Sequence, residues 1–224
     1  MIVGFFSMKG GVGKSTLAIN LSAYLRKFYG KKVILIDFNF YNYSSKVFSG
    51  ENLLEYGDNL CEGIYPLKYF HIKFVKRFPS NLERDLGILK AYYDYIVMDV
   101  PNDLNLMLSL EKYVDLIFLV LTPEIFSIFS NLYLYRILEK NKVRILVNRV
   151  QNIDDIKMIE REFGRVSAII HYNKDFLRSS YLKVPLPFMK KKGKALDEID
   201  ELASIITGER KRKSILEKIV SFFL

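Results

Sequence analysis

The glycine-rich stretch 8–16 constrains the fold of this chain more than any other feature. It follows the apolar run Ile2–Phe6 directly and leads into a helical pattern from Ser15 to Tyr29. A short strand, a glycine loop and a helix in this order are typical of a phosphate-binding loop, because glycines let the backbone aim successive N–H groups at phosphate oxygens. An ordinary glycine turn is the alternative. The residues expected to contact a nucleotide are Lys9, Gly10, Gly11, Val12, Gly13, Lys14, Ser15 and Thr16.

Two residues at the end of this stretch carry the expected chemistry. Lys14 would reach the β- and γ-phosphates of the nucleotide. The hydroxyl of Ser15 would bind Mg²⁺ at the start of the helix, where the helix dipole also favours anions. The sequence therefore predicts a site for a nucleotide and Mg²⁺.

The loop departs from the standard pattern G-x-x-x-x-G-K-[ST], because Met8 stands where the first glycine would fall and Lys9 follows it. In this it resembles the deviant P-loop (x-K-G-G-x-G-K-[ST]) of the MinD/ParA family of dimerising ATPases. The resemblance implies that Lys9 crosses a dimer interface and contacts the nucleotide of a second copy, so an ATP-dependent homodimer is expected. Spacing alone predicts only a second cation near the phosphates, and a solvated loop lysine is the alternative.

Composition restricts the class of protein further. With 224 residues, half of them hydrophobic, the chain is expected to form one soluble domain with a large core. No apolar run approaches the ~20 residues of a membrane span, and the first strand begins at Ile2, so we expect a cytoplasmic protein without a signal peptide. Cys61 is the single cysteine, which excludes an intrachain disulfide and a C-x-x-C metal pair. The net charge of +9 favours an anionic partner, either a membrane surface or nucleic acid.

Apolar runs and helical patterns alternate along the chain. Helical patterns include Ile125–Glu139 and Ile153–Phe163, whereas Tyr43–Pro79 shows no readable pattern. This alternation predicts an α/β fold with a mostly parallel central sheet covered by helices on both faces. Together with the glycine loop, it indicates a fold of the P-loop NTPase type. We expect an ATPase domain at residues 1–208 and a tail at 209–224. The further strands are expected at Val33–Asp37, Tyr95–Asp99, Leu116–Leu121, Val143–Val147 and Val166–Ile170.

Two of these predicted strands end in a carboxylate, Asp37 and Asp99. Ligands of parallel sheets gather at the carboxyl ends of the strands, where the phosphate loop also lies. Mg²⁺ prefers oxygen ligands and often retains waters, so both residues are candidate metal-binding groups together with Ser15. Solvated strand-end residues are the alternative.

The family resemblance extends to the following loops. Asp99-Val100-Pro101 resembles the D-x-P of the second switch of the family, and Thr122-Pro123-Glu124 resembles its T-P-E loop. Asn39 stands where the family usually has the second Asp of D-x-D, which positions or activates the attacking water. Because an amide cannot accept a proton as a carboxylate does, we expect slow ATP hydrolysis. Lys9, Lys14 and Asn39 are the expected catalytic residues.

A strand-end pair further along the chain, Asn148 and Arg149, matches the N-R of the same family. The resemblance implies that Asn148 binds the adenine, which favours ATP over GTP. An asparagine that stabilises the strand–loop junction is the alternative.

The tail combines a basic cluster, 210–213, with an amphipathic pattern. This combination is typical of an in-plane membrane anchor, and the MinD branch of the family carries a similar helix. A final helix that packs on the core of the domain is the alternative. The residues expected to enter the membrane are Ile215, Leu216, Ile219, Val220, Phe222 and Phe223.

The features together predict a MinD-like ATPase, peripheral on the inner face of the cell membrane, that regulates the placement of cell division or flagella. Its expected partners are a second copy, an anionic membrane surface and an unidentified activating protein. A ParA-like DNA segregation ATPase, with 190–194 on phosphates, is one alternative. A nucleotide-gated scaffold with little hydrolysis is the other.

Overall fold

The computed structural model describes the chain except residues 41–45, 47, 49–58, 153, 191 and 212–224. Within the described residues, eight strands form one sheet in the order β3-β4-β2-β5-β1-β6-β7-β8, parallel except for β3. The strands are β1 (Ile2–Phe6), β2 (Val33–Asp37), β3 (Ile64–Pro66), β4 (His71–Phe74), β5 (Tyr95–Asp99), β6 (Leu116–Leu121), β7 (Val143–Val150) and β8 (Val166–His171).

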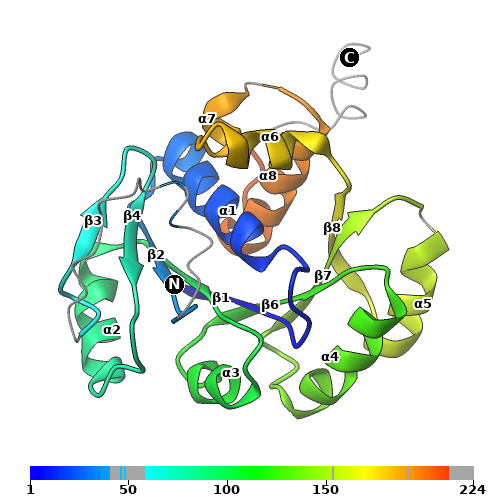
Figure 1. Ribbon diagram of the computed structural model, residues 1–224, viewed down its shortest axis with the longest axis horizontal. Coiled ribbons are helices and arrows are strands. Elements are labelled where there is room, and N and C mark those ends of the chain that lie inside the picture. Colours follow the sequence, from blue (N-terminus) through cyan, green and yellow to red (C-terminus); the bar gives the residue numbers. More distant parts are fainter. Residues whose placement is uncertain (41–45, 47, 49–58, 153, 191, 212–224) are drawn as a thin grey trace.

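Helices cover both faces of this sheet and make a three-layer α/β/α arrangement. In Figure 1, α1, α6, α7 and α8 lie above the sheet, and α2, α3, α4 and α5 lie below it. The described helices are α1 (Lys14–Tyr29), α2 (Leu82–Tyr92), α3 (Leu104–Glu111), α4 (Ile125–Ile137), α5 (Asp154–Phe163), α6 (Lys174–Tyr181), α7 (Leu186–Met189) and α8 (Lys194–Thr207).

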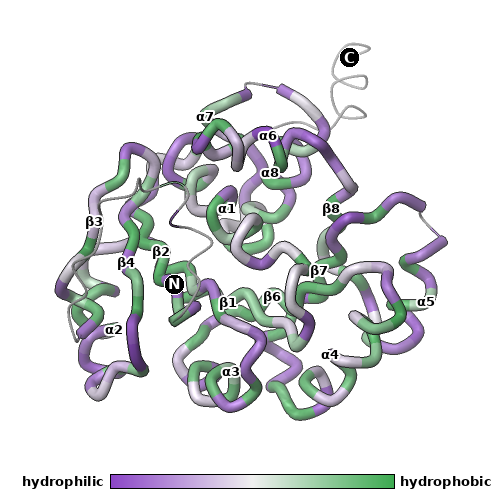
Figure 2. The backbone as a smooth tube through the Cα atoms, viewed as in Figure 1, coloured by the Kyte–Doolittle hydropathy of each residue, from purple (hydrophilic) through white to green (hydrophobic). Residues whose placement is uncertain are grey.

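The apolar strands are explained by burial on both faces. In β1, Val3 and Phe5 pack in one hydrophobic cluster with α1 and α8, whereas Ile2 and Phe6 pack in the other with α2 to α5. Side chains alternate between the faces of a strand, so a strand covered on both sides needs an apolar residue at nearly every position. The hydrophobic colour therefore concentrates along the central strands in Figure 2.

The structure confirms the predicted α/β fold, with small changes at element ends. The helix that was expected to run to Glu139 ends at Ile137, and the strand expected to end at Val147 continues to Val150. The unreadable segment contains the hairpin β3–β4, of which only β4 joins the parallel part of the sheet. None of the described helices is both long and apolar enough to cross a bilayer.

Candidate functional site

The glycine loop lies at the carboxyl edge of the sheet, between the end of β1 and the start of α1. Gly11 and Gly13 have φ angles of 75° and 98°, in the left-handed region that side chains rarely adopt. Gly13 is the N-cap of α1, so the first N–H groups of the helix point into the loop. The positive φ angles and the helix N-terminus fit a phosphate cradle.

Lys14 is buried inside this loop, with 8% of its surface exposed. Its Nζ atom lies 3.5 Å from the carbonyl oxygen of Ser7. Burial lowers the pKa of Lys14, and the negative charge of Asp99 opposes that change. The ammonium group is thus held in the interior of the loop, where an anion is the natural additional partner.

Both predicted metal-binding carboxylates lie at the same edge, because Asp37 of β2 and Asp99 of β5 are register partners in the sheet. Both side chains are fully buried. The Nδ2 atom of Asn39 donates to Asp37 Oδ1 at 2.7 Å and to Asp99 Oδ2 at 3.0 Å. Asn39 therefore bridges two buried carboxylates that would otherwise repel each other, a contact that sequence reasoning did not foresee.

The carboxyl group of Asp99 has the properties of a cation ligand. Burial raises the pKa of Asp99 to about 7 and the charge of Asp37 adds to this, whereas Ser15, Lys14 and Asn39 oppose it. Its Oδ1 atom is buried without a hydrogen-bond partner in the described part of the chain. A buried, unpartnered oxygen beside a second carboxylate and the Ser15 hydroxyl fits a hard cation such as Mg²⁺.

We expect Mg²⁺-dependent nucleotide binding to weaken at acidic pH. A carboxyl group must lose its proton before it binds a cation, and the pKa of Asp99 is raised to about 7, so protons compete with Mg²⁺ below that pH. The Mg²⁺ concentration that gives half-maximal binding of a fluorescent ATP analogue should rise about tenfold between pH 8 and pH 6. Equal Mg²⁺ requirements at both pH values would contradict this assignment.

Lys9 does not turn into the loop that it belongs to. Its ammonium group forms an ion pair with the carboxylate of Glu124, the residue that precedes α4. The pair lies at the surface, with 28% of the Lys9 side chain and 55% of the Glu124 side chain exposed. Lys9 therefore stands beside the phosphate site rather than within it.

A pocket of about 310 Å³ opens beside the loop, a volume within the range of small-molecule sites. Its walls come from α1, the end of β7, the end of β8 and α6. The lining residues are Gly13, Thr16, Leu17, Asn148, Arg149, His171, Tyr172, Asn173, Phe176, Leu177 and Ser180.

Asn148 lines this pocket as expected, but its side chain also supports the loop. Its Nδ2 atom donates to the carbonyl oxygen of Val12 at 2.7 Å, and its Oδ1 atom accepts from the backbone N–H of Arg149 at 2.9 Å. Both polar ends of the side chain are thus engaged within the chain. The adenine contact stays a prediction, and bracing of the phosphate loop is the role that the geometry displays.

Sequence reasoning missed the pocket residues at the end of β8 and in α6. His171 receives support from α8, because its Nδ1 atom lies 2.7 Å from Glu198 Oε1. Phe176 and Leu177 belong to α6, whose first turn is capped by the side chain of Asn173. The position of His171 directly after a predicted parallel strand was the available signal, since strand ends meet at the ligand edge.

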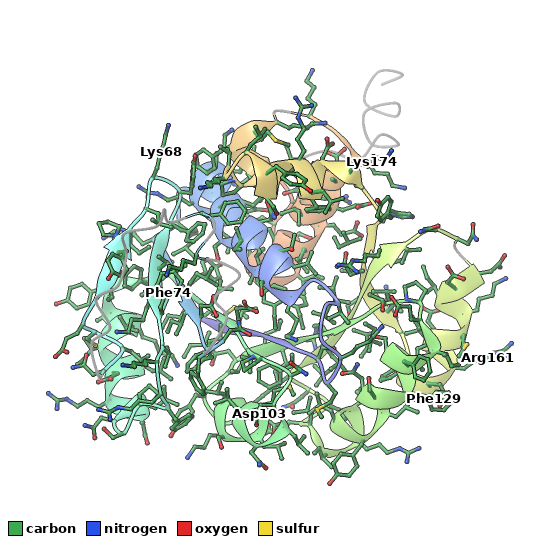
Figure 3. All side chains as sticks on the ribbon, viewed as in Figure 1. Lys68, Phe74, Asp103, Phe129, Arg161 and Lys174 are labelled. Carbon is green, nitrogen blue, oxygen red and sulfur yellow. The ribbon has the colours of Figure 1, made fainter. Side chains whose placement is uncertain are left out.

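The structure brings together the predicted residues of the loop, the metal site and the N-R pair. Asp103, which lies between β5 and α3, caps α3, with its Oδ1 atom accepting from Leu106 N at 2.9 Å. Figure 3 shows it at the start of that helix. The predicted membrane residues at 215–223 lie outside the described residues.

A glycine loop between a parallel strand and a helix, with a buried lysine and two strand-end carboxylates, defines a P-loop nucleotide-binding protein. The model of the CobQ/CobB/MinD/ParA nucleotide binding domain matches residues 3–186. The chain belongs to this family.

Two relatives are similar to this chain in sequence, and one solved structure is similar to it in fold. An uncharacterized ATP-binding protein of Methanocaldococcus jannaschii is 27% identical, over 93% of this chain and 88% of its own length. A virulence plasmid ParA family protein of Chlamydia trachomatis is 34% identical, over 55% of this chain and 57% of its own. The septum site-determining protein MinD of Pyrococcus horikoshii, solved with Mg-ADP, has a TM-score of 0.78 and 22% identity, covering 95% of this chain and 99% of that chain.

Proposed function

We propose that this protein is a MinD-like ATPase that dimerises when it binds ATP, attaches reversibly to the inner face of the membrane and regulates the placement of cell division or flagella. The observation that carries this proposal is the position of Lys9. The ammonium group is held at the surface by Glu124, beside the phosphate site, while Lys14 occupies the interior of the same loop. A second copy that docks at this edge can receive Lys9 on its own nucleotide.

The surface next to Lys9 supports a protein interface. The helix α4 begins directly after Glu124 and exposes Phe126, Phe129 and Tyr133 with 77%, 63% and 61% of their surface accessible. Figure 3 shows Phe129 on the outer side of α4. A helix that is apolar on its solvent face as well as its core face is unusual for a free surface. We propose that a second copy or an activating protein covers it.

The chemistry of the site supports ATP hydrolysis, and we propose that it is slow. Lys14 would hold the β- and γ-phosphates, and Ser15, Asp37 and Asp99 would hold Mg²⁺, which when bound would supply positive charge next to the γ-phosphate. The amide of Asn39 keeps the two carboxylates in place. It would orient an attacking water through hydrogen bonding, but it would not accept the proton of that water as a carboxylate does.

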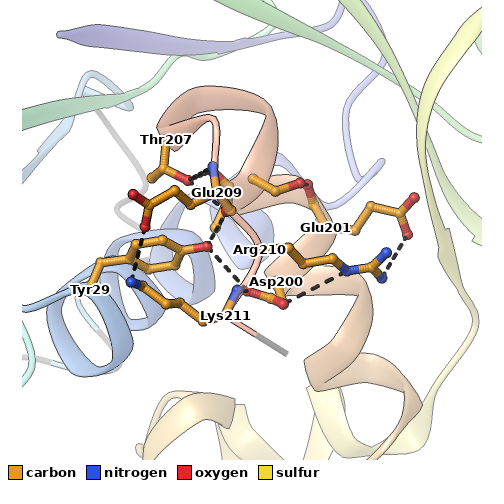
Figure 4. Close-up of polar contacts among 9 residues, drawn as sticks. Tyr29, Asp200, Glu201, Thr207, Glu209, Arg210 and Lys211 are labelled. Carbon is orange, nitrogen blue, oxygen red and sulfur yellow. Dashed lines mark hydrogen bonds and ion pairs between the residues drawn. The ribbon is translucent and has the colours of Figure 1, made fainter. Parts of the chain in front are cut away.

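The region after Gly208 supports regulated membrane attachment, and we propose that the ATPase domain ends there. Gly208 ends α8 in the left-handed conformation. Two basic residues that follow are held on the body: Arg210 lies 3.8 Å from Asp200, and the backbone N–H of Lys211 donates to Asp200 Oδ1 at 3.2 Å. Figure 4 shows this network around Tyr29, whose hydroxyl donates to the Glu209 carbonyl oxygen at 2.6 Å. Anionic lipid would compete with Asp200 for the guanidinium group of Arg210, and with Glu209, whose Oε2 lies 3.0 Å from Lys211 Nζ, for the ammonium group of Lys211.

Non-sequence-specific DNA binding, as in ParA proteins, is the second candidate, favoured by the net charge of +9. The basic island at 190–194 supports it weakly, because Lys190 pairs with Asp175 and Lys194 lies 4.0 Å from Glu198. Cations already paired with carboxylates contribute less to a phosphate contact.

Replacing Lys9 with alanine tests the dimer. We expect Lys9→Ala to weaken ATP-dependent dimerisation at least tenfold in analytical ultracentrifugation, because each interface loses a charge-assisted contact of about 1.5–3 kcal/mol. Binding of ATP to the monomer should change less than about threefold, since Lys14 remains in the loop.

The matched control is Glu124→Gln, which removes the partner of Lys9 within the chain and leaves the lysine in place. This variant should dimerise at least as tightly as the wild type. A Lys9→Ala protein that dimerises with wild-type affinity in ATP would overturn the proposed role of Lys9.

A further inference from the structure

A second pocket, of about 360 Å³, lies at the edge of the sheet opposite to the phosphate loop. It opens at the amino ends of β2 and β4, between the last turns of α1 and α2. Its volume lies within the range of small-molecule sites, roughly 300–1,000 Å³. The lining residues are Arg26, Lys32, Val33, Leu67, Lys68, Phe70, His71, Tyr92 and Tyr93.

The rim of this pocket carries three exposed cations: Arg26, Lys32 and Lys68. None of the three forms an ion pair with another described residue, and no carboxylate lines the pocket. The neighbouring Asp94 accepts a hydrogen bond from the backbone N–H of Lys32 at 2.7 Å, so it is engaged with the backbone. The positive charge of the pocket is therefore available to an anion.

Stabilisation of a helix end explains only part of this charge. Arg26 lies in the last turn of α1, where a cation offsets the helix dipole, and Lys32 follows shortly after that end. Lys68 lies instead on the tight turn between β3 and β4. In this turn the backbone N–H of Leu67 donates a hydrogen bond to the carbonyl oxygen of Phe70 at 3.0 Å. Figure 3 shows the Lys68 side chain projecting from this turn.

The remaining walls are aromatic and apolar. The side chain of Tyr92 lines the pocket, and 68% of the surface of this residue is exposed. The hydroxyl of Tyr93 lies 2.7 Å from Nδ1 of His71, and the two rings meet edge to face. Val33 and Phe70 are buried and form an apolar floor. Flat rings beside cations suit a ligand that combines a planar base with a phosphate.

We propose that this pocket binds a nucleotide unit, with the phosphate held by Arg26, Lys32 and Lys68 and the base stacked on Tyr92. The shared chemistry is a base linked to a phosphate, and the source is either a free nucleotide or a nucleotide within a single strand of nucleic acid. This site is separate from the phosphate loop and does not depend on the proposed membrane function.

Binding of a fluorescent dT12 oligonucleotide, measured by anisotropy with only one equivalent of Mg-ADP present to fill the phosphate loop, tests the site. Lys32→Glu combined with Lys68→Glu should weaken binding at least tenfold and reduce the slope of log affinity against log salt by roughly 1.4. Tyr92→Leu should weaken binding about fivefold or more, and Tyr92→Phe should retain it, because stacking needs the ring and not the hydroxyl.

The matched control for charge is Lys157→Glu with Arg161→Glu on α5, on the other side of the molecule from Lys68 (Figure 3). This protein carries the same net charge as the pocket variant and should bind dT12 within about twofold of the wild type.

Competition by millimolar thymidine monophosphate would support the site and identify a free nucleotide as its ligand. If the wild type binds dT12, thymidine monophosphate does not compete, and the pocket variant loses the binding, the site is supported and its ligand is a single strand of nucleic acid. Absence of binding of both probes, or equal loss in the pocket and control variants, would overturn the proposal.

Discussion

Replacing Gly13 with alanine is expected to abolish ATP binding, with a loss of at least about a hundredfold in affinity. Gly13 has a φ angle of 98°, and a Cβ atom there would lie 2.3 Å from Nδ2 of Asn148. The side chain of Asn148 would have to move away and lose its hydrogen bond to the Val12 carbonyl, and alanine would be strained at this φ angle, so the loop would lose both its support and its backbone conformation. Titration calorimetry with Mg-ATP measures the loss.

The matched control for this prediction is Gly30→Ala. Gly30 also has a left-handed conformation, with a φ angle of 65°, but no atom lies within 4 Å of a Cβ built there. This variant should lose about 1 kcal/mol of stability and bind ATP as the wild type does. A Gly13→Ala protein that binds Mg-ATP with wild-type affinity would show that the loop does not form the phosphate site.

Replacing Asn39 with aspartate is expected to make the stability of the protein depend on Mg²⁺. The amide of Asn39 donates to Asp37 and Asp99, so the substitution removes two hydrogen bonds and adds a third carboxylate to the pair. At pH 8, above the pKa of about 7 of Asp99, the free energy of unfolding without Mg²⁺ should fall by roughly 2–4 kcal/mol. Urea unfolding with and without Mg²⁺ measures the difference.

Asn39→Ala separates the lost donors from the added charge. This variant should be destabilised by about 1–3 kcal/mol, and Mg²⁺ should restore less of its stability than it restores in Asn39→Asp. With ATP present, Asn39→Asp should also hydrolyse it roughly ten times faster or more, because a carboxylate accepts a proton from the attacking water. Unchanged stability of Asn39→Asp in the absence of Mg²⁺ would refute the bridging role of Asn39.

The positions of the carboxylates could be predicted from sequence because they depend on local pattern alone. An apolar run that ends in Asp predicts a buried strand with its carboxylate at the ligand edge, and both Asp37 and Asp99 follow this rule. Their pairing in register follows from the order of parallel strands, which places β2 beside β5. The phosphate loop is equally local, because its strand, glycines and helix are continuous in the chain.

The contacts that decide the roles of these residues could not be predicted in this way. The hydrogen bond from Asn148 to Val12 and the ion pair between Lys9 and Glu124 each join segments that are more than a hundred residues apart. The bridge made by Asn39 depends on the distance between two strand ends, which no spacing in the sequence encodes. Residues of the pocket beside the phosphate loop, such as His171, carry no motif, and only the topology of the sheet places them there.

Co-sedimentation with anionic liposomes tests the proposed nucleotide-driven membrane switch most directly. The intact protein is compared in ATP and in ADP, alongside a chain that ends after Gly208. Two tails joined in an ATP-bound dimer bind a surface far more tightly than one, because the second engages at high effective concentration. We predict that the intact protein pellets in ATP, pellets much less in ADP, and stays in solution in both when the tail is removed. Equal pelleting of the intact and shortened chains, or no pelleting of either in ATP, would contradict this function.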